Sequence, residues 1–130
     1  MPRKPKWKIL QELDTFTLQY LETALWSSTD NADECGGEPL DANYGVEDFT
    51  RAALVQAVQD CKDFQEANEN MLGTDGNDDS RAGHDFWLTR NGHGAGFWDG
   101  DWPTHGDALT DASKVYGEVY LYPYRGKVHC

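Results

Sequence analysis

The chain has few of the residues that build disulfide-rich or zinc-binding domains. Its 130 residues include three cysteines, Cys35, Cys61 and Cys130. Because the number is odd and the three are scattered, they form neither a disulfide framework nor a paired-cysteine metal motif. Free thiols are typical of a cytosolic protein. No neighbouring pattern marks any of them as a nucleophile, and we expect no metal and no cofactor.

Long apolar runs are also missing. No stretch is long enough to cross a bilayer, and the basic start of the chain has no apolar segment behind it that would make a signal peptide. We therefore expect neither membrane insertion nor secretion. A phosphate-binding glycine loop and a compact metal spacing such as HExxH are absent too, so the common enzyme signatures do not apply.

Basic residues are scarce. There are 11 Lys and Arg against 23 Asp and Glu, a net charge of −12. Four of the bases, Arg3, Lys4, Lys6 and Lys8, lie in the first eight positions, so the rest of the chain carries 23 acids against 7 bases. Such a surface repels nucleic acid and favours basic protein partners. The alternative is that the charge serves solubility alone.

Outside residues 83–100, which are described below, the sequence predicts three helices and one strand. Asp14 is a good N-cap, and Gly73 and Gly117 are good helix ends. We expect a basic arm over residues 1–13, followed by one acidic domain over 14–130. Its expected elements are helices over Asp14–Trp26, Asp48–Leu72 and Asp107–Tyr116, a long acidic loop over Ser27–Gly45, a flexible acidic loop over Gly73–Gly83, and a strand over Glu118–Tyr124.

The segment from Gly83 to Gly100 is the most unusual. It combines two His, two Asp, one Arg, two Trp, two Phe and several Gly. Apolar and polar residues alternate from His84 to Arg90, and Asn91-Gly92 is the strongest two-residue hairpin signal. The pattern therefore predicts a β-hairpin that turns at Asn91-Gly92.

In this hairpin one face would carry an apolar centre between two polar ends. Arg90 would pair with His93 at the turn, and His84 would pair with Asp99 at the far end. Trp87 and Trp98 would lie on the other face, beside glycines. This face would either look outward, where the rings could anchor a protein partner, or lie under the acidic loop over Ser27–Gly45. The candidate binding residues are therefore Trp87, Trp98, His84, Asp99, Arg90 and His93.

Together these elements predict an α+β fold in the order α-α-β-β-α-β. The last strand most simply returns beside the first hairpin strand, which gives a three-stranded antiparallel sheet in the order 2-1-3 with helices on one face. The helix over Asp48–Leu72 would cover Phe86, Leu88 and Phe97.

Several phrases of the chain resemble a group of small proteins encoded by bacteriophages and prophages. They are Ala24–Asp30, Glu38–Tyr44, Gly83–Asn91 and Gly96–Asp99, and the likeness runs from about Leu21 to Tyr122. The resemblance carries no catalytic residues to transfer. It implies a phage origin and a location in the host cytoplasm.

Two functions from different classes are consistent with these features. In the first, a phage-encoded acidic protein docks on a basic host protein and inhibits or redirects it, as an anti-restriction or anti-CRISPR factor that mimics nucleic acid would. It would not bind nucleic acid or membranes itself, and its oligomeric state is left open. In the second, a small enzyme or ligand-binding protein uses a His/Asp/Arg site on the 84–99 hairpin. The charge favours the first.

Overall fold

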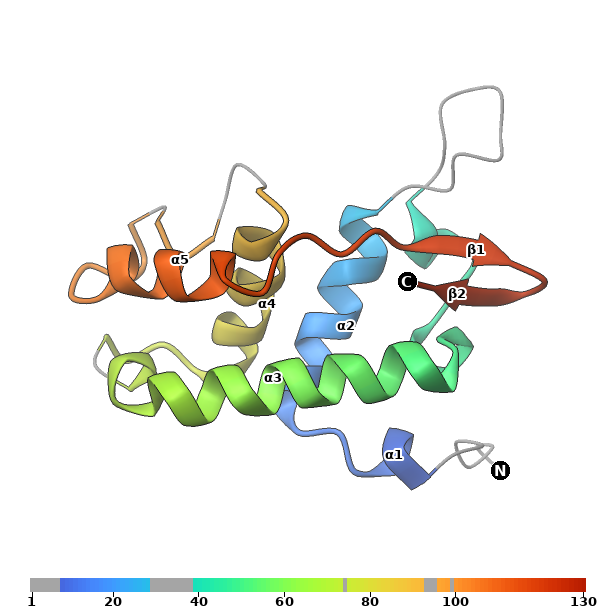
Figure 1. Ribbon diagram of the computed structural model, residues 1–130, viewed down its shortest axis with the longest axis horizontal. Helices are drawn as coiled ribbons and strands as arrows, with labels where there is room; N and C mark the ends of the chain where they lie inside the picture. The colour runs from blue at the N-terminus through green and yellow to red at the C-terminus, as the bar shows by residue number, and fades with distance from the viewer. Residues whose placement is uncertain (1–7, 29–38, 74, 93–95, 99) are drawn as a thin grey trace.

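The protein has an α+β fold dominated by helices. The computed structural model describes residues 8–28, 39–73, 75–92, 96–98 and 100–130. In chain order the elements are α1 (Lys8–Gln11), α2 (Thr15–Ser27), the 3₁₀ turns η1 (Leu40–Ala42) and η2 (Val46–Asp48), α3 (Arg51–Leu72), α4 (Asp79–Arg90), α5 (Gly106–Lys114), β1 (Tyr122–Tyr124) and β2 (Lys127–His129). Figure 1 shows α3 along the long axis of the molecule, with α2 and α4 running across it.

Three of these helices confirm the sequence prediction. Asp14 caps α2 by accepting a hydrogen bond from the Thr17 amide at 2.8 Å. The next long helix starts at Arg51 rather than Asp48, because Thr50 is its N-cap and residues before it form η2. Gly73 ends α3 as expected. The third helix, α5, lies within two residues of its predicted bounds.

The predicted hairpin over residues 84–99 is wrong, because residues 79–90 form helix α4. Asp78 starts this helix by accepting a hydrogen bond from the Arg81 amide at 2.8 Å. Asn91 and Gly92 end it, and Gly92 adopts a φ of +70°. A helix end and a tight hairpin turn both favour a positive φ, so Asn-Gly fits either structure.

Helix α4 is buried on most of its surface, and this burial explains why the alternating pattern wrongly predicted a strand. Every residue from Asp85 to Arg90 is buried, so the helix shows no polar stripe in its second half. A helix surrounded by protein loses the 3.6-residue periodicity that would identify it. The alternation of Phe86 and Leu88 with polar neighbours then resembles a strand.

The predicted three-stranded sheet, in the order 2-1-3, is also corrected. Among the described residues the sheet has two antiparallel strands, β1 and β2, paired from Tyr122–His129 to Tyr124–Lys127. Their turn is Arg125-Gly126, with φ of +51° and +77°. The expected strand over 118–124 shortens to β1, since the Val119 amide instead donates to the Asn91 side chain at 2.7 Å.

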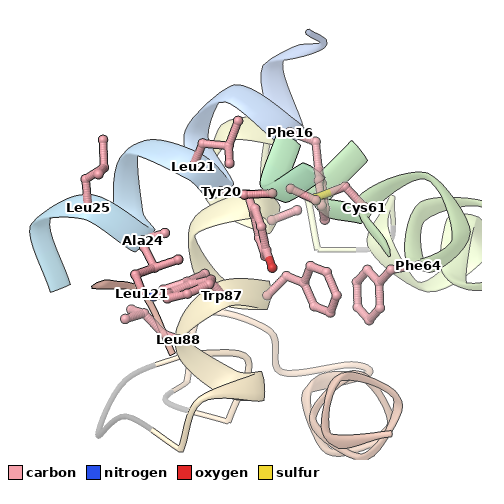
Figure 2. Packing of buried hydrophobic residues seen from close by; sticks show 14 of the residues in the cluster. Phe16, Tyr20, Leu21, Ala24, Leu25, Cys61, Phe64, Trp87, Leu88 and Leu121 are labelled. Carbon is pink, nitrogen blue, oxygen red and sulfur yellow. The ribbon is translucent and has the colours of Figure 1, made fainter. Parts of the chain in front are cut away.

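The core is centred on the crossing of α2 and α4. Gly83 on α4 permits it, since a Cβ there would lie 2.1 Å from the Phe16 carbonyl oxygen on α2. Aromatic rings fill the space between these helices and α3: the Phe64 and Phe86 centroids are 4.1 Å apart, and those of Phe64 and Phe97 are 5.7 Å apart. Figure 2 shows Tyr20 and Trp87 from the two crossing helices, with Phe64 of α3 nearby. Of the three residues that the long helix was predicted to cover, Phe86 and Phe97 are therefore confirmed. The third, Leu88, is buried on α4.

Candidate functional site

The structure separates the residues that the hairpin would have joined. Arg90 lies inside the molecule, where its guanidinium donates to the carbonyl oxygens of Gly117 and Tyr116 at 2.8 and 2.9 Å. It also contacts the Tyr20 hydroxyl at 3.0 Å and the Asp60 carboxylate at 2.9 Å. A buried arginine needs such partners to offset its desolvation. Arg90 therefore joins α4, α3 and the segment after α5, and no face of it is open to a ligand.

Trp87 is likewise internal, so of its two predicted placements the outward-facing one is wrong. Only 2% of the residue is exposed. Its indole nitrogen donates to the Ser27 hydroxyl at 2.7 Å, and its ring packs edge-on against Tyr20 at 5.3 Å. Trp98, by contrast, is 52% exposed. The two tryptophans therefore do not form a common surface.

His93 and Asp99 lie outside the described residues, so the predicted pairs Arg90–His93 and His84–Asp99 fall there too. His84 has another acidic partner in the structure. Its Nδ1 lies 2.9 Å from Oδ1 of Asp85, the next residue in α4. The His84 ring also packs against Trp26, with 5.7 Å between ring centroids.

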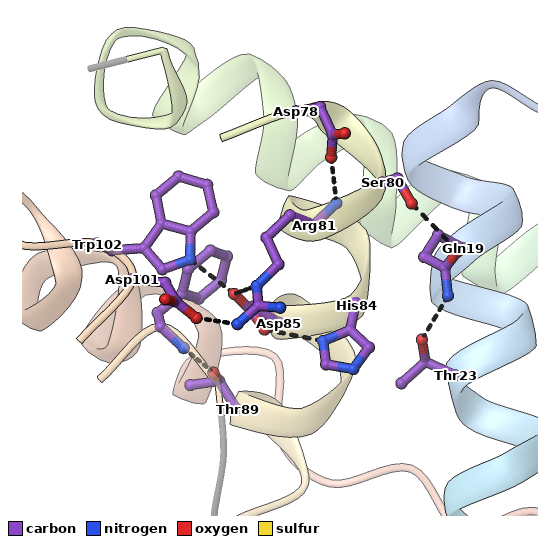
Figure 3. A network of polar contacts seen from close by, with 11 residues as sticks. Gln19, Thr23, Asp78, Ser80, Arg81, His84, Asp85, Thr89, Asp101 and Trp102 are labelled. Atoms are coloured by element: carbon purple, nitrogen blue, oxygen red, sulfur yellow. Dashed lines mark hydrogen bonds and ion pairs between the residues drawn. The ribbon is translucent and has the colours of Figure 1, made fainter. Parts of the chain in front are cut away.

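Asp85 is the centre of a buried polar network (Figure 3). Only 1% of this residue is exposed. Its carboxylate accepts hydrogen bonds from the Trp102 indole at 2.6 Å and from Nε of Arg81 at 3.2 Å, in addition to the His84 contact. Arg81 in turn pairs with Asp101. The network fixes the segment before α5 on the outer side of α4 and orients the His84 ring.

A polar hollow of about 530 Å³ opens beside this network, between α2 and the first turns of α4. It is lined by Gln19, Gly76, Asn77, Asp78, Ser80, Arg81, His84 and Asp101. Of the predicted site residues that the structure describes, His84 alone contributes to it. Figure 3 shows His84 and Arg81 on α4 facing this region, with Gln19 on the neighbouring α2.

A second hollow of about 440 Å³, here called the acidic groove, adjoins the first and shares Asn77 with it. It lies over the end of α3 and the start of α4, and is lined by Gln65, Glu66, Glu69, Leu72, Gly73, Asn77 and Asp79. None of the described residues in this lining is basic. Within the described part of the chain, Glu66, Glu69 and Asp79 have no ion-pair partner.

Groups suited to covalent or metal chemistry are not gathered here. Burial raises the pKa of the Cys61 thiol well above its usual value, which keeps the thiol protonated and inert. Burial also raises the pKa of Tyr20. Over the described residues, no group of three or more His, Cys, Asp or Glu side chains is placed to hold a metal ion. The arrangement is suited to non-covalent recognition.

Sequence reasoning missed the residues around the hollow that lie before Gly83. Asp78, Asp79, Ser80 and Arg81 were expected in a flexible acidic loop, yet they form the cap and first turn of α4. The signal was present, because an Asp followed by further polar residues and then an apolar run is a typical helix start.

The chain matches no protein-family model, no curated protein and no solved structure. None of the helices in the described residues has the length and apolar character needed to span a bilayer. The function of the protein must therefore be inferred from the chemistry of the two hollows.

Proposed function

We propose that this protein is an acidic docking factor, of the kind that phages use against their hosts, which binds a basic surface of a host protein in the bacterial cytoplasm. The partner would be a protein whose basic groove normally holds nucleic acid, such as a restriction enzyme or a CRISPR complex. By occupying that groove with carboxylates, the factor would inhibit or redirect its host partner.

The acidic groove is the observation that carries this proposal. It presents Glu66, Glu69 and Asp79 together in a hollow whose lining, over the part of the chain that the structure describes, holds no base. Like charges held together cost stability, unless a partner neutralises them. Arg81, the base nearest to Asp79 in sequence, is already paired with Asp85 and Asp101. Lys62 lies one turn before Glu66 on α3, and among the described residues it forms no ion pair with the groove carboxylates.

The position of the carboxylates also supports recognition of a repeating basic surface. They come from two elements, since Glu66 and Glu69 lie on either side of a kink at Asn68 in α3 while Asp79 is on the first turn of α4. The buried Asn68 side chain donates to the Phe64 carbonyl oxygen at 2.9 Å, which holds the kink in place. α3 is packed through Phe64, and α4 through most of its length, so their spacing is fixed before binding. A preformed array loses less entropy on association than a mobile acidic tail would.

The test compares two sets of charge-neutral variants. The groove variant is Glu66→Gln, Glu69→Gln and Asp79→Asn. The matched control is Asp107→Asn, Asp111→Asn and Glu118→Gln, three exposed carboxylates that line neither hollow. Each set changes the net charge from −12 to −9 and removes one acid from the first turn of a helix.

Proteins captured from bacterial lysate on the parent chain are identified, and their association rates with all three chains are measured at low and high salt. We expect the parent and the control to associate at least roughly tenfold faster at low salt than at high salt, and the groove variant to lose most of that difference. If the groove variant and the control bind equally well, the proposal is wrong and the charge serves solubility.

A further inference from the structure

In the polar hollow beside His84, the hydrogen-bond donors are largely used within the protein. The Ser80 hydroxyl donates to Oε1 of Gln19 at 3.2 Å, and Nε2 of Gln19 donates to the Thr23 hydroxyl at 3.2 Å. The Asn77 amide donates to the Asp101 carbonyl oxygen at 2.7 Å.

The guanidinium of Arg81 is held in the same way. Its Nε donates to Asp85 at 3.2 Å, and one terminal nitrogen pairs with Asp101. These contacts place two of its nitrogens against carboxylates that belong to the fold. Arg81 is therefore poorly placed to attract an anionic ligand into the hollow.

The acceptors of the hollow are, in contrast, mostly open. Within the described residues no hydrogen bond reaches Oδ2 of Asp78, Oδ1 of Asp101, Oδ1 of Asn77 or Nε2 of His84. Asp85 faces Nδ1 of His84, so in the neutral ring Nδ1 carries the proton and Nε2 accepts. The hollow thus offers acceptors from four side chains.

The net charge around the hollow is negative, which also favours a ligand that donates hydrogen bonds. Three carboxylates lie in or directly behind the hollow, those of Asp78, Asp85 and Asp101, against the single guanidinium of Arg81. The difference is two negative charges when His84 is neutral. A ligand that fits must therefore be a cation with several donors.

We propose that this hollow binds a guanidinium group, presented as an arginine side chain by the basic partner; this inference rests on the proposed docking function. A guanidinium is planar and carries five N–H donors, so it can satisfy acceptors from several directions at once, whereas an ammonium has three donors at one point. Trp26, 44% exposed and packed on His84, offers an aromatic surface beside the hollow for the planar group or its aliphatic stem.

The probes are three end-blocked pentapeptides, Gly-Ser-Xaa-Ser-Gly, with arginine, lysine or citrulline at the centre. Citrulline keeps the shape of arginine but lacks its charge. Binding to the full chain is followed by NMR chemical-shift titration. We expect the arginine peptide to shift the signals of His84, Trp26 and Asn77 and to bind about threefold or more tightly than the lysine peptide, with citrulline weakest. Equal affinities for the three peptides would overturn the inference.

A pair of double variants locates the site. Asp78→Asn with Asp101→Asn removes two charges from the hollow, and Asn still serves as an N-cap at position 78. Asp79→Asn with Glu66→Gln removes two charges from the acidic groove and is the matched control. The first should weaken the arginine peptide about tenfold and the second less than about twofold, with thermal unfolding used to confirm that both fold. Equal weakening by the two double variants would mean unspecific attraction and would refute a specific site.

The two proposals fail in different ways. If the arginine peptide does not bind, while the captured host partner still associates in a salt-dependent manner through the groove, the guanidinium site is wrong and the docking function stands. If the peptide binds in the hollow but the groove variant leaves partner binding unchanged, the docking proposal is wrong and the guanidinium site keeps its own support.

Discussion

Replacing Gly83 by alanine tests the crossing of α2 and α4, on which the rest of the fold depends. Considered as an isolated helix position, the change should stabilise the protein, because alanine is about 1 kcal/mol more favourable than glycine inside a helix. The surroundings predict the opposite. An ideal Cβ at Gly83 would lie 2.1 Å from the carbonyl oxygen of Phe16 and 2.9 Å from its carbonyl carbon.

The magnitude follows from the displacement that relieves this clash. Ordinary carbon–oxygen contacts are about 3.3 Å or longer, so α2 and α4 must separate by about 1 Å. The obstacle is backbone and cannot rotate away, and separation loosens the contact between Phe16 and Phe86, whose ring centroids are 6.0 Å apart. Overpacking of this kind costs about 3 kcal/mol, so we expect a net loss of at least about 2 kcal/mol and a fall in Tm of about 8 °C.

Urea unfolding followed by far-UV circular dichroism measures the free-energy change. Gly73→Ala is the matched control, because a Cβ there would meet its nearest atom, the Glu69 carbonyl oxygen, at 3.9 Å. We expect this control to change stability by less than about 1 kcal/mol. A stabilised Gly83→Ala protein would refute both the close helix crossing and the assignment of residues 79–90 to a helix in contact with α2.

Two further predictions concern the tryptophans Trp87 and Trp98 and the N-cap residue of α2, Asp14. Trp87→Ala should cost about 3–5 kcal/mol of unfolding free energy because the ring is buried, whereas Trp98→Ala should change it by less than about 0.5 kcal/mol; similar losses for both would contradict this placement. Asp14→Ala should cost about 1 kcal/mol at neutral pH through the lost N-cap. Burial raises the pKa of Asp14, but hydrogen bonds from Thr17 and Gln65 outweigh burial and lower it below 3.8. The ionised cap therefore stabilises the fold above the unfolded pKa and ceases to do so as pH falls through the lower folded pKa. The loss of unfolding free energy caused by Asp14→Ala, measured by urea unfolding, should therefore shrink below about pH 3.8. A loss that stays constant with pH would contradict the assignment of Asp14 as an ionised cap.

The sequence predicts α2, α3 and α5 well because each keeps one side in water. Their apolar residues recur at helical spacing, and their ends carry recognisable residues such as Asp14 and Gly73. These are local signals, and the tertiary structure does not override them. The basic arm over 1–13 is described only from residue 8, where α1 begins.

Local signals were insufficient for α4, because its environment comes from segments distant in sequence. Arg90 depends on Asp60 and Tyr116, and Asp85 depends on Trp102, none of which a local pattern identifies. The sheet failed for a related reason. Arg125-Gly126 is a weaker turn signal than Asn91-Gly92, yet Arg125-Gly126 connects the two strands while Asn91-Gly92 ends helix α4.

The same interior contacts change which residues can serve function. A cluster of His, Asp, Arg and Trp indicates a site only if the fold leaves its polar atoms unsatisfied. Arg90 and Asp85 are fully partnered inside, and in the described residues no buried side-chain nitrogen or oxygen lacks a hydrogen bond. Their removal would leave a buried charge uncompensated, which is a structural role. Under the functions proposed above, recognition would use what this interior holds in place at the surface, namely the open acceptors beside His84 and the carboxylates of the acidic groove.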